Sequence, residues 1–189
     1  GNGNGNGNGV LDRKNLGDIY QTAFTYLDSL NSLDFFISLA WSHTEPSGMD
    51  EFGNSLLHSW WNEPTEEDGY AVYAGMRYDL DGLYSQIGLE FNWGSKNWIN
   101  FSQDLETSKL GTRGFVYETY WIFQPTLAPS YSNFPQLIAR IGYQYFDYEY
   151  TGSGFWLGEP VETDTIENNL FYNPIDSEYR LYAALEVYF

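Results

Sequence analysis

The last eleven residues of the chain, Tyr179–Phe189, constrain the fold more than any other stretch. They read YRLYAALEVYF and alternate strictly between an apolar row and a mixed, charged row. Alternation at period two is the pattern of a β-strand whose two faces meet different environments. A soluble protein rarely finishes on a fully amphipathic strand, because chain termini usually fray. The ending therefore argues against an ordinary soluble domain.

Six further stretches alternate in the same way and predict β-strands. They lie at residues 17–27, 34–43, 70–78, 83–93, 113–123 and 137–148. Each strand has about 9–12 residues, which is the length that a strand needs to cross a bilayer at a tilt. We therefore expect residues 17–189 to form one all-β domain. Residues 1–16 open with GNGNGNGNG and predict a flexible segment, because Gly and Asn tolerate positive φ and supply no core.

The connections between these strands alternate in length. Long polar connections at 44–69, 94–112 and 151–177 are separated by shorter ones at 28–33, 79–82 and 124–135. Outer-membrane barrels have short periplasmic turns and longer external loops. The sequence therefore predicts an antiparallel transmembrane β-barrel with three long loops on one side and short turns on the other. Because single-chain bacterial barrels have even strand numbers and open edges are not tolerated in lipid, we expect the C-terminal seven-strand portion of a larger barrel.

Composition narrows the function classes. Aromatic residues make up 20% of the chain, with 17 Tyr and 7 Trp, and such side chains concentrate at membrane interfaces. The net charge of −18, from 26 acidic and 8 basic residues, argues against nucleic-acid binding, which depends on Lys and Arg. Because Cys is absent, disulfides, iron–sulfur clusters and thiolate zinc sites are excluded within this chain. The longest apolar stretch, near Phe35–Trp41, is too short for a transmembrane helix.

Charged residues in the mixed strand rows are the candidate functional residues. They are Arg77, Glu90, Glu118, Arg140, Arg180 and Glu186. In a barrel these rows line the lumen, because an Arg facing lipid near the midplane would cost about 2–4 kcal/mol. We expect an internal network of ion pairs and hydrogen bonds that sets the polarity of a pore. Acidic loops would favour cations at its mouth.

Neither catalysis nor a cofactor is expected. Ser42 and His43 are adjacent on a strand and so point to opposite faces, which rules out a nucleophile–base pair. The acidic loops suit a solvated surface, with a loop-bound calcium or magnesium ion as the alternative. The nearest segment, TEEDGYAV at 65–72, has acids and a Gly but lacks the later Glu of the twelve-residue calcium loop.

The aromatic residues divide into two groups. Those near strand ends predict interface girdles: Tyr70, Tyr78, Trp93, Trp98, Trp121 and Phe189. The loop residues Trp60, Trp61 and Trp156 could instead stack on sugar. They support the alternative hypothesis of a secreted or surface β-sandwich that binds carbohydrate.

Two segments resemble a known family. KLGTRGFVYETYWIFQ at 109–124 and ARIGYQYFDYEYTGSGFWLGEP at 139–160 are similar to the C-terminal half of uncharacterised, porin-like bacterial outer-membrane proteins, a domain of unknown function. The resemblance covers about half of the chain and leaves out the Gly-Asn opening. It implies an outer-membrane barrel, a channel or scaffold with no agreed activity, in proteins that carry more chain upstream. Expected partners are the lipid bilayer, lipopolysaccharide and the insertion machinery, whose signal the terminal Phe189 resembles.

Overall fold

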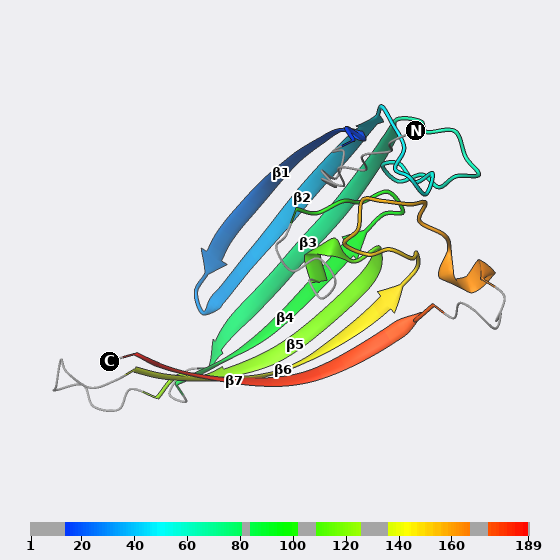
Figure 1. Cartoon of the computed structure of the whole chain (residues 1–189). Helices are drawn as coiled ribbons and strands as arrows, with labels where there is room; N and C mark the ends of the chain where they lie inside the picture. Colours follow the sequence, from blue (N-terminus) through cyan, green and yellow to red (C-terminus); the bar gives the residue numbers. More distant parts are fainter. Residues whose placement is uncertain (1–13, 81–83, 102–108, 126–135, 167–173, 189) are drawn as a thin grey trace, which may run out of the picture.

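The computed structural model describes residues 14–80, 84–101, 109–125, 136–166 and 174–188. It contains seven strands: β1 (Gly17–Leu30), β2 (Leu33–Pro46), β3 (Glu67–Leu80), β4 (Ser85–Gly94), β5 (Gly114–Phe123), β6 (Gln136–Tyr148) and β7 (Ser177–Tyr188). All lie in one antiparallel sheet in the order β1 to β7 (Figure 1). The seven predicted strands are therefore confirmed. The only described helices are two short 3₁₀ turns, η1 (Lys109–Gly111) and η2 (Thr163–Thr165), so no helix in these ranges could span a membrane.

Several strands are longer than predicted. β1, β2 and β3 have 14 residues each, because the ladder continues into segments expected to be loops. The first connection, predicted over 28–33, is a turn of only Asn31 and Ser32, since Leu30 already pairs with Leu33. Asn31 adopts φ 55°, a conformation that two-residue hairpin turns require and Asn tolerates.

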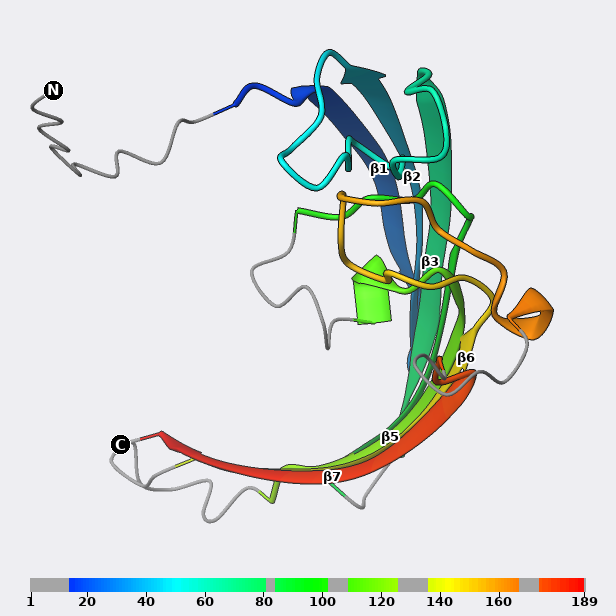
Figure 2. The same cartoon turned by 45° about the vertical axis from the view of Figure 1, so that its right-hand side comes forward.

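The sheet is strongly curved, with a concave and a convex face (Figure 2). It is not closed, since β1 and β7 each pair with a single strand among the described residues. The long connections all leave the same end of the antiparallel sheet. Parts of them fold over the concave side, where η1 lies (Figure 2). The position of the long connections at one end follows the sequence prediction, whereas closure into a barrel stays a prediction. The expected flexible segment, residues 1–16, lies almost entirely outside the described residues.

Strand register separates the side chains of the two faces. Lys109 of η1 bonds Glu90 and Glu118, which places these two residues and their row on the concave face. The alternate row is convex and aligns apolar residues across strands, as in the pairs Phe24↔Leu39, Met76↔Leu89 and Trp121↔Ile141. Acidic, basic and histidine side chains on the convex row of the described strands lie only near strand ends: Asp18, Asp28, His43, Glu45, Asp68 and Asp147.

Burial is inverted relative to a soluble sheet protein. The convex apolar residues are exposed, with Leu181 at 80% and Phe24 at 67%. The concave row instead buries polar residues, among them Ser42, Asn92 and Glu118. An exposed apolar surface that extends across a whole sheet marks an interaction or membrane surface. The buried apolar core is small, and much of it lies under the long loops.

Glycines on the concave face accommodate tyrosine rings from the next strand. Gly88 is opposite Tyr120, and Gly142 is opposite Tyr182. A Cβ at Gly88 would lie 2.0 Å from the Tyr120 ring. A larger residue here must displace the ring, which is the geometry of overpacking.

We expect Gly88→Val to lower the free energy of unfolding by about 1–3 kcal/mol, because Tyr120 must leave its position. Urea unfolding of the folded protein, followed by tryptophan fluorescence, measures the change. Ala183→Val is the matched control, since Ala183 is exposed on the convex face. Equal stability of the two variants would contradict this packing.

Candidate functional site

A charged network on the concave face is centred on Glu118, which is only 4% exposed. Its carboxylate accepts hydrogen bonds from Lys109 Nζ at 2.6 Å, Arg140 Nη2 at 2.9 Å and Gln144 Nε2 at 3.1 Å. The Tyr182 hydroxyl also donates to it. A buried carboxylate needs such partners, because an unpaired charge there is costly. Four donors satisfy it and leave it poorly placed to act as a general base.

A second carboxylate lies directly across the strand pair. Glu90 on β4 is opposite Glu118 on β5, and like charges in directly opposite positions destabilise a sheet. Lys109 compensates by bonding both carboxylates, and the Tyr73 hydroxyl donates to Glu90 at 2.5 Å. Burial opposes the charge of Lys109, but the bonds to Glu118 and Glu90 outweigh it and raise its pKa above the ordinary range. Lys109 therefore stays protonated at neutral pH.

Aromatic rings complete the network. The Arg140 guanidinium lies 3.9 Å from the centre of the Tyr120 ring and 5.5 Å from that of Tyr182. Lys109 Nζ lies 5.0 Å from the centre of the Tyr73 ring. Such cation–π contacts contribute about 0.5–2 kcal/mol each, depending on desolvation. Two carboxylates and two cations thus form a charge-balanced cluster that is held by tyrosines.

The structure places all six predicted lumen residues on the concave row. Glu90, Glu118 and Arg140 belong to the network. Arg77 instead pairs with Asp34 at 2.8 Å near the turn end.

The other two predicted residues lie on β7. Arg180 contacts Glu178 at 2.5 Å near the loop end. Glu186 is exposed and lies opposite Ile138. Phe189, the predicted insertion signal, lies outside the described residues. The lumen role of all six stays a prediction.

Sequence reasoning missed Lys109 and the tyrosines of the network. Lys109 lies in the long connection predicted at 94–112, and nothing in its spacing links it to Glu90. The predicted register could have given a signal, since it placed Glu90 and Glu118 on one face of neighbouring strands. An acidic pair of this kind needs a cation, and the chain has only 8 basic residues.

Arg113 joins two of the long loops. It is 1% exposed, and its guanidinium donates to the carbonyls of Trp98, Thr151, Gly152 and Phe155 at 2.7–3.1 Å. Burial lowers the pKa of Arg113 to about 10, so the side chain remains charged at neutral pH. The sequence had placed Arg113 in the fifth strand, but its side chain ties the second loop to the third.

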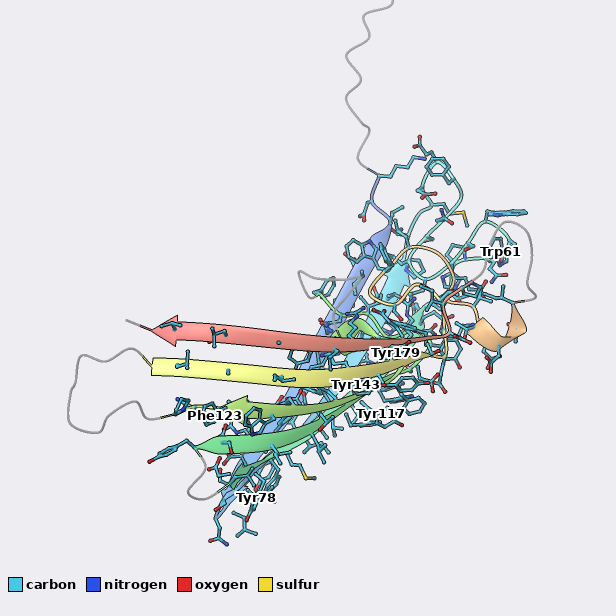
Figure 3. All side chains as sticks on the ribbon, turned by 90° about the horizontal axis from the view of Figure 1, so that it is seen from below. Trp61, Tyr78, Tyr117, Phe123, Tyr143 and Tyr179 are labelled. Carbon is cyan, nitrogen blue, oxygen red and sulfur yellow. The ribbon has the colours of Figure 1, made fainter. Side chains whose placement is uncertain are left out.

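The first and third long loops are also interlocked. Leu57 N donates to Trp156 O at 2.8 Å. Glu159 accepts from Trp61 Nε1 at 2.8 Å and from Asn62 Nδ2 at 2.6 Å. The three loops therefore form one cap at this end of the sheet. Trp61, labelled in Figure 3, and Trp60 are exposed, whereas Trp156 is half-buried.

The structure shows how the neighbours Ser42 and His43, considered above as a nucleophile–base pair, are oriented. Ser42 Oγ accepts from Ile99 N at 3.3 Å on the concave side, while His43 Nδ1 lies 3.0 Å from Asp68 Oδ1 on the convex side. The two neighbours therefore point apart.

The described residues hold no group of three or more His, Asp or Glu side chains that is placed to bind a metal. Asp50 of the first loop accepts from the backbone N–H groups of Asn54 and Phe52. The hydrogen bond from the Asn54 backbone N–H is the main reason why the pKa of Asp50 lies below its ordinary value. The loop-bound cation stays a prediction.

The chain matches a family described as "Protein of unknown function (DUF3373)" over residues 3–189. It belongs to this family. The match covers nearly the whole chain and most of the Gly-Asn opening, so the resemblance expected over half of the chain was too narrow. The expectation of an uncharacterised family is confirmed. No curated protein and no solved structure matches the chain significantly.

We expect Arg113→Met to loosen the loop cap, because four buried carbonyls lose their donor and each unsatisfied group costs about 1–3 kcal/mol. Thermolysin should then cut the long loops of the variant faster than those of the wild type. A loss of about 1.4 kcal/mol in local stability would raise the rate of cleavage about tenfold. Lys14→Met is the control, since Lys14 is exposed and lies before β1, outside the cap. Equal digestion of both variants would show that Arg113 does not hold the cap.

Proposed function

We propose that this chain forms part of the wall of a bacterial outer-membrane β-barrel that acts as a porin-like channel with a polar, charged lumen. The observation that carries the proposal is the convex face. Over seven strands it exposes apolar side chains and keeps charge at the strand ends. A surface of this kind matches the outward apolar band of such barrels.

The width of this band fits a membrane. Tyr70 and Tyr78 lie on the convex row of β3, eight residues apart, which is about 27 Å along an extended strand. A tilt of roughly 40° reduces this to about 20 Å across the bilayer, close to the ~25 Å of outer-membrane barrels. Between them lie only Val72, Ala74 and Met76 on this row.

Aromatic side chains border the band. Figure 3 shows Tyr117, Tyr143 and Tyr179 in a row across β5, β6 and β7. Trp121 and Phe123 stack towards the turn end, with ring centroids 5.6 Å apart. Tyrosine and tryptophan prefer the two membrane–water interfaces, since their rings have an apolar body and a polar tip. The arrangement supports the girdle hypothesis for Tyr70, Tyr78 and Trp121. The prediction is wrong for Trp98, which is buried on the concave side, where its Nε1 donates to Leu110 O.

The concave face supports a polar lumen. It holds the network around Glu118, and the interior of an outer-membrane barrel is polar. The competing β-sandwich needs a second sheet packed on an apolar face. The described residues form a single sheet, and their loop cap covers the polar face. These features favour the barrel over the sandwich.

Closure is a requirement of this proposal. In the bilayer core an unpaired backbone group costs several kcal/mol, so no strand edge can face lipid. The free edges of β1 and β7 must therefore pair with strands beyond the described ones. The proposed barrel lies in the outer membrane with lipid and lipopolysaccharide around it, and Phe189 would serve as its insertion signal. A scaffold role without an open lumen is the second candidate.

We expect Leu181→Arg to lower the free energy of unfolding in lipid by about 2–4 kcal/mol, because a guanidinium would face hydrocarbon. Leu181 is 80% exposed, so the same change in a water-exposed sheet would cost almost nothing. Ser177→Arg, on the same face at the end of β7, should cost only about 0–1 kcal/mol near the interface. Equal effects of the two substitutions, measured by urea titration in vesicles, would refute the membrane location.

Channel activity is tested in planar bilayers. The full-length protein, purified in detergent, should give conductance steps above background, and heat-unfolded protein is the control. Correctly inserted protein that gives no steps, with the Lys109→Met variant also silent, would eliminate the channel and leave the scaffold. A chain that stays monodisperse without detergent would eliminate the membrane proposal altogether.

A further inference from the structure

The described parts of the second long connection lie over the concave face (Figure 2). We call its described parts, residues 95–101 and 109–113, the crossing segment. On the β1–β2 side, Gln21 Nε2 donates to Ile99 O at 3.0 Å and Ile99 N donates to Ser42 Oγ. On the β4 side, Asn92 Nδ2 donates to Lys109 O at 2.7 Å. The segment therefore links β1 and β2 to β4 across the concave face.

The crossing segment is packed closely on the sheet. Trp98 and Ile99 are buried, and Trp98 Nε1 donates to Leu110 O at 2.7 Å, which links the two described parts. A Cβ at Gly69 of β3 would lie 2.3 Å from Asn97 O. Only glycine at this position lets the backbone of the segment approach so closely.

Two hollows lie on the concave face beside this segment. One, of about 330 Å³, is lined by the segment and by strand residues that include Gln21, Tyr73 and Asn92. The other, of about 770 Å³, lies towards the turn end and is lined in part by Arg77, Glu90, Tyr120 and Arg140. Tyr73 lines the first hollow and Glu90 the second, and the two side chains are hydrogen-bonded. The network of Lys109 thus stands between the two hollows.

We propose that the crossing segment narrows the lumen at the level of this network and that Lys109 is the residue that positions it. The inference rests on the proposed channel. Lys109 is the segment's ionic link to Glu90 and Glu118, two carboxylates in directly opposite positions. Without it, the segment loses this anchor, and negative charge at the narrowest level of the lumen is left uncompensated. Lys109 therefore sets both the width and the charge selectivity of the passage.

The test compares the full-length protein with Lys109→Met in planar bilayers. We expect single-channel conductance to rise at least about twofold and the reversal potential in a salt gradient to shift towards cation selectivity, since fixed carboxylates at a constriction favour cations. Polyethylene glycols of increasing size report the width. Lys96→Met is the matched control, because it removes a lysine of the same segment that lies outside the network.

A second variant keeps the test informative if Glu90, left without a cation by the loss of Lys109, prevents folding. Lys109→Met with Glu90→Gln leaves Glu118 bound by Arg140, Gln144 and Tyr182. It should show the wider passage with little change in selectivity. If the wild type conducts and the variants have the same conductance and selectivity, this inference is wrong while the channel proposal stands. A silent wild type with conducting variants would support it, with the segment acting as a plug. Silence of all correctly inserted proteins would overturn both this inference and the channel.

Discussion

The opposed carboxylates of Glu90 and Glu118 are the constraint on which the concave face depends. Two like charges in directly opposite positions destabilise the pairing of their strands unless a cation compensates them. Lys109 comes from a loop to supply it, Arg140 adds a second charge, and tyrosine hydroxyls satisfy the remaining acceptors. The need for compensation thus draws the second long connection onto the sheet, and the other two long loops are interlocked with it through Arg113 and their own contacts.

The two faces of the sheet differ in the kind of side chain that they bury. Glu118 is buried and fully paired, whereas Leu181 on the other face is mostly exposed. In water this arrangement would forgo the main driving force of folding, which is apolar burial. In a membrane it is favourable, because lipid covers the apolar face and the polar groups are satisfied internally. The barrel proposal therefore implies that the observed sheet is stable in lipid and not in water.

Much of the sheet could be predicted from the sequence. Side-chain alternation is a local property with a period of exactly two residues, so Tyr179–Phe189 and its counterparts identified the strands, their faces and the alternation of loop lengths. Strand ends were less predictable. The segment Asp28–Leu33 contains turn-forming residues, yet all but Asn31 and Ser32 pair in the ladder, because pairing with a neighbour outweighs local turn preference.

The sequence by itself thus determined seven amphipathic strands and the placement of Arg77, Glu90, Glu118, Arg140, Arg180 and Glu186 on one row. Only the tertiary structure decided that Lys109 bridges Glu90 and Glu118 and that Arg113 binds carbonyls some 40 residues further along the chain. The physical reason is that periodicity records which face a residue occupies. The meeting of a loop with a strand depends on the curvature of the whole sheet, which no local pattern contains.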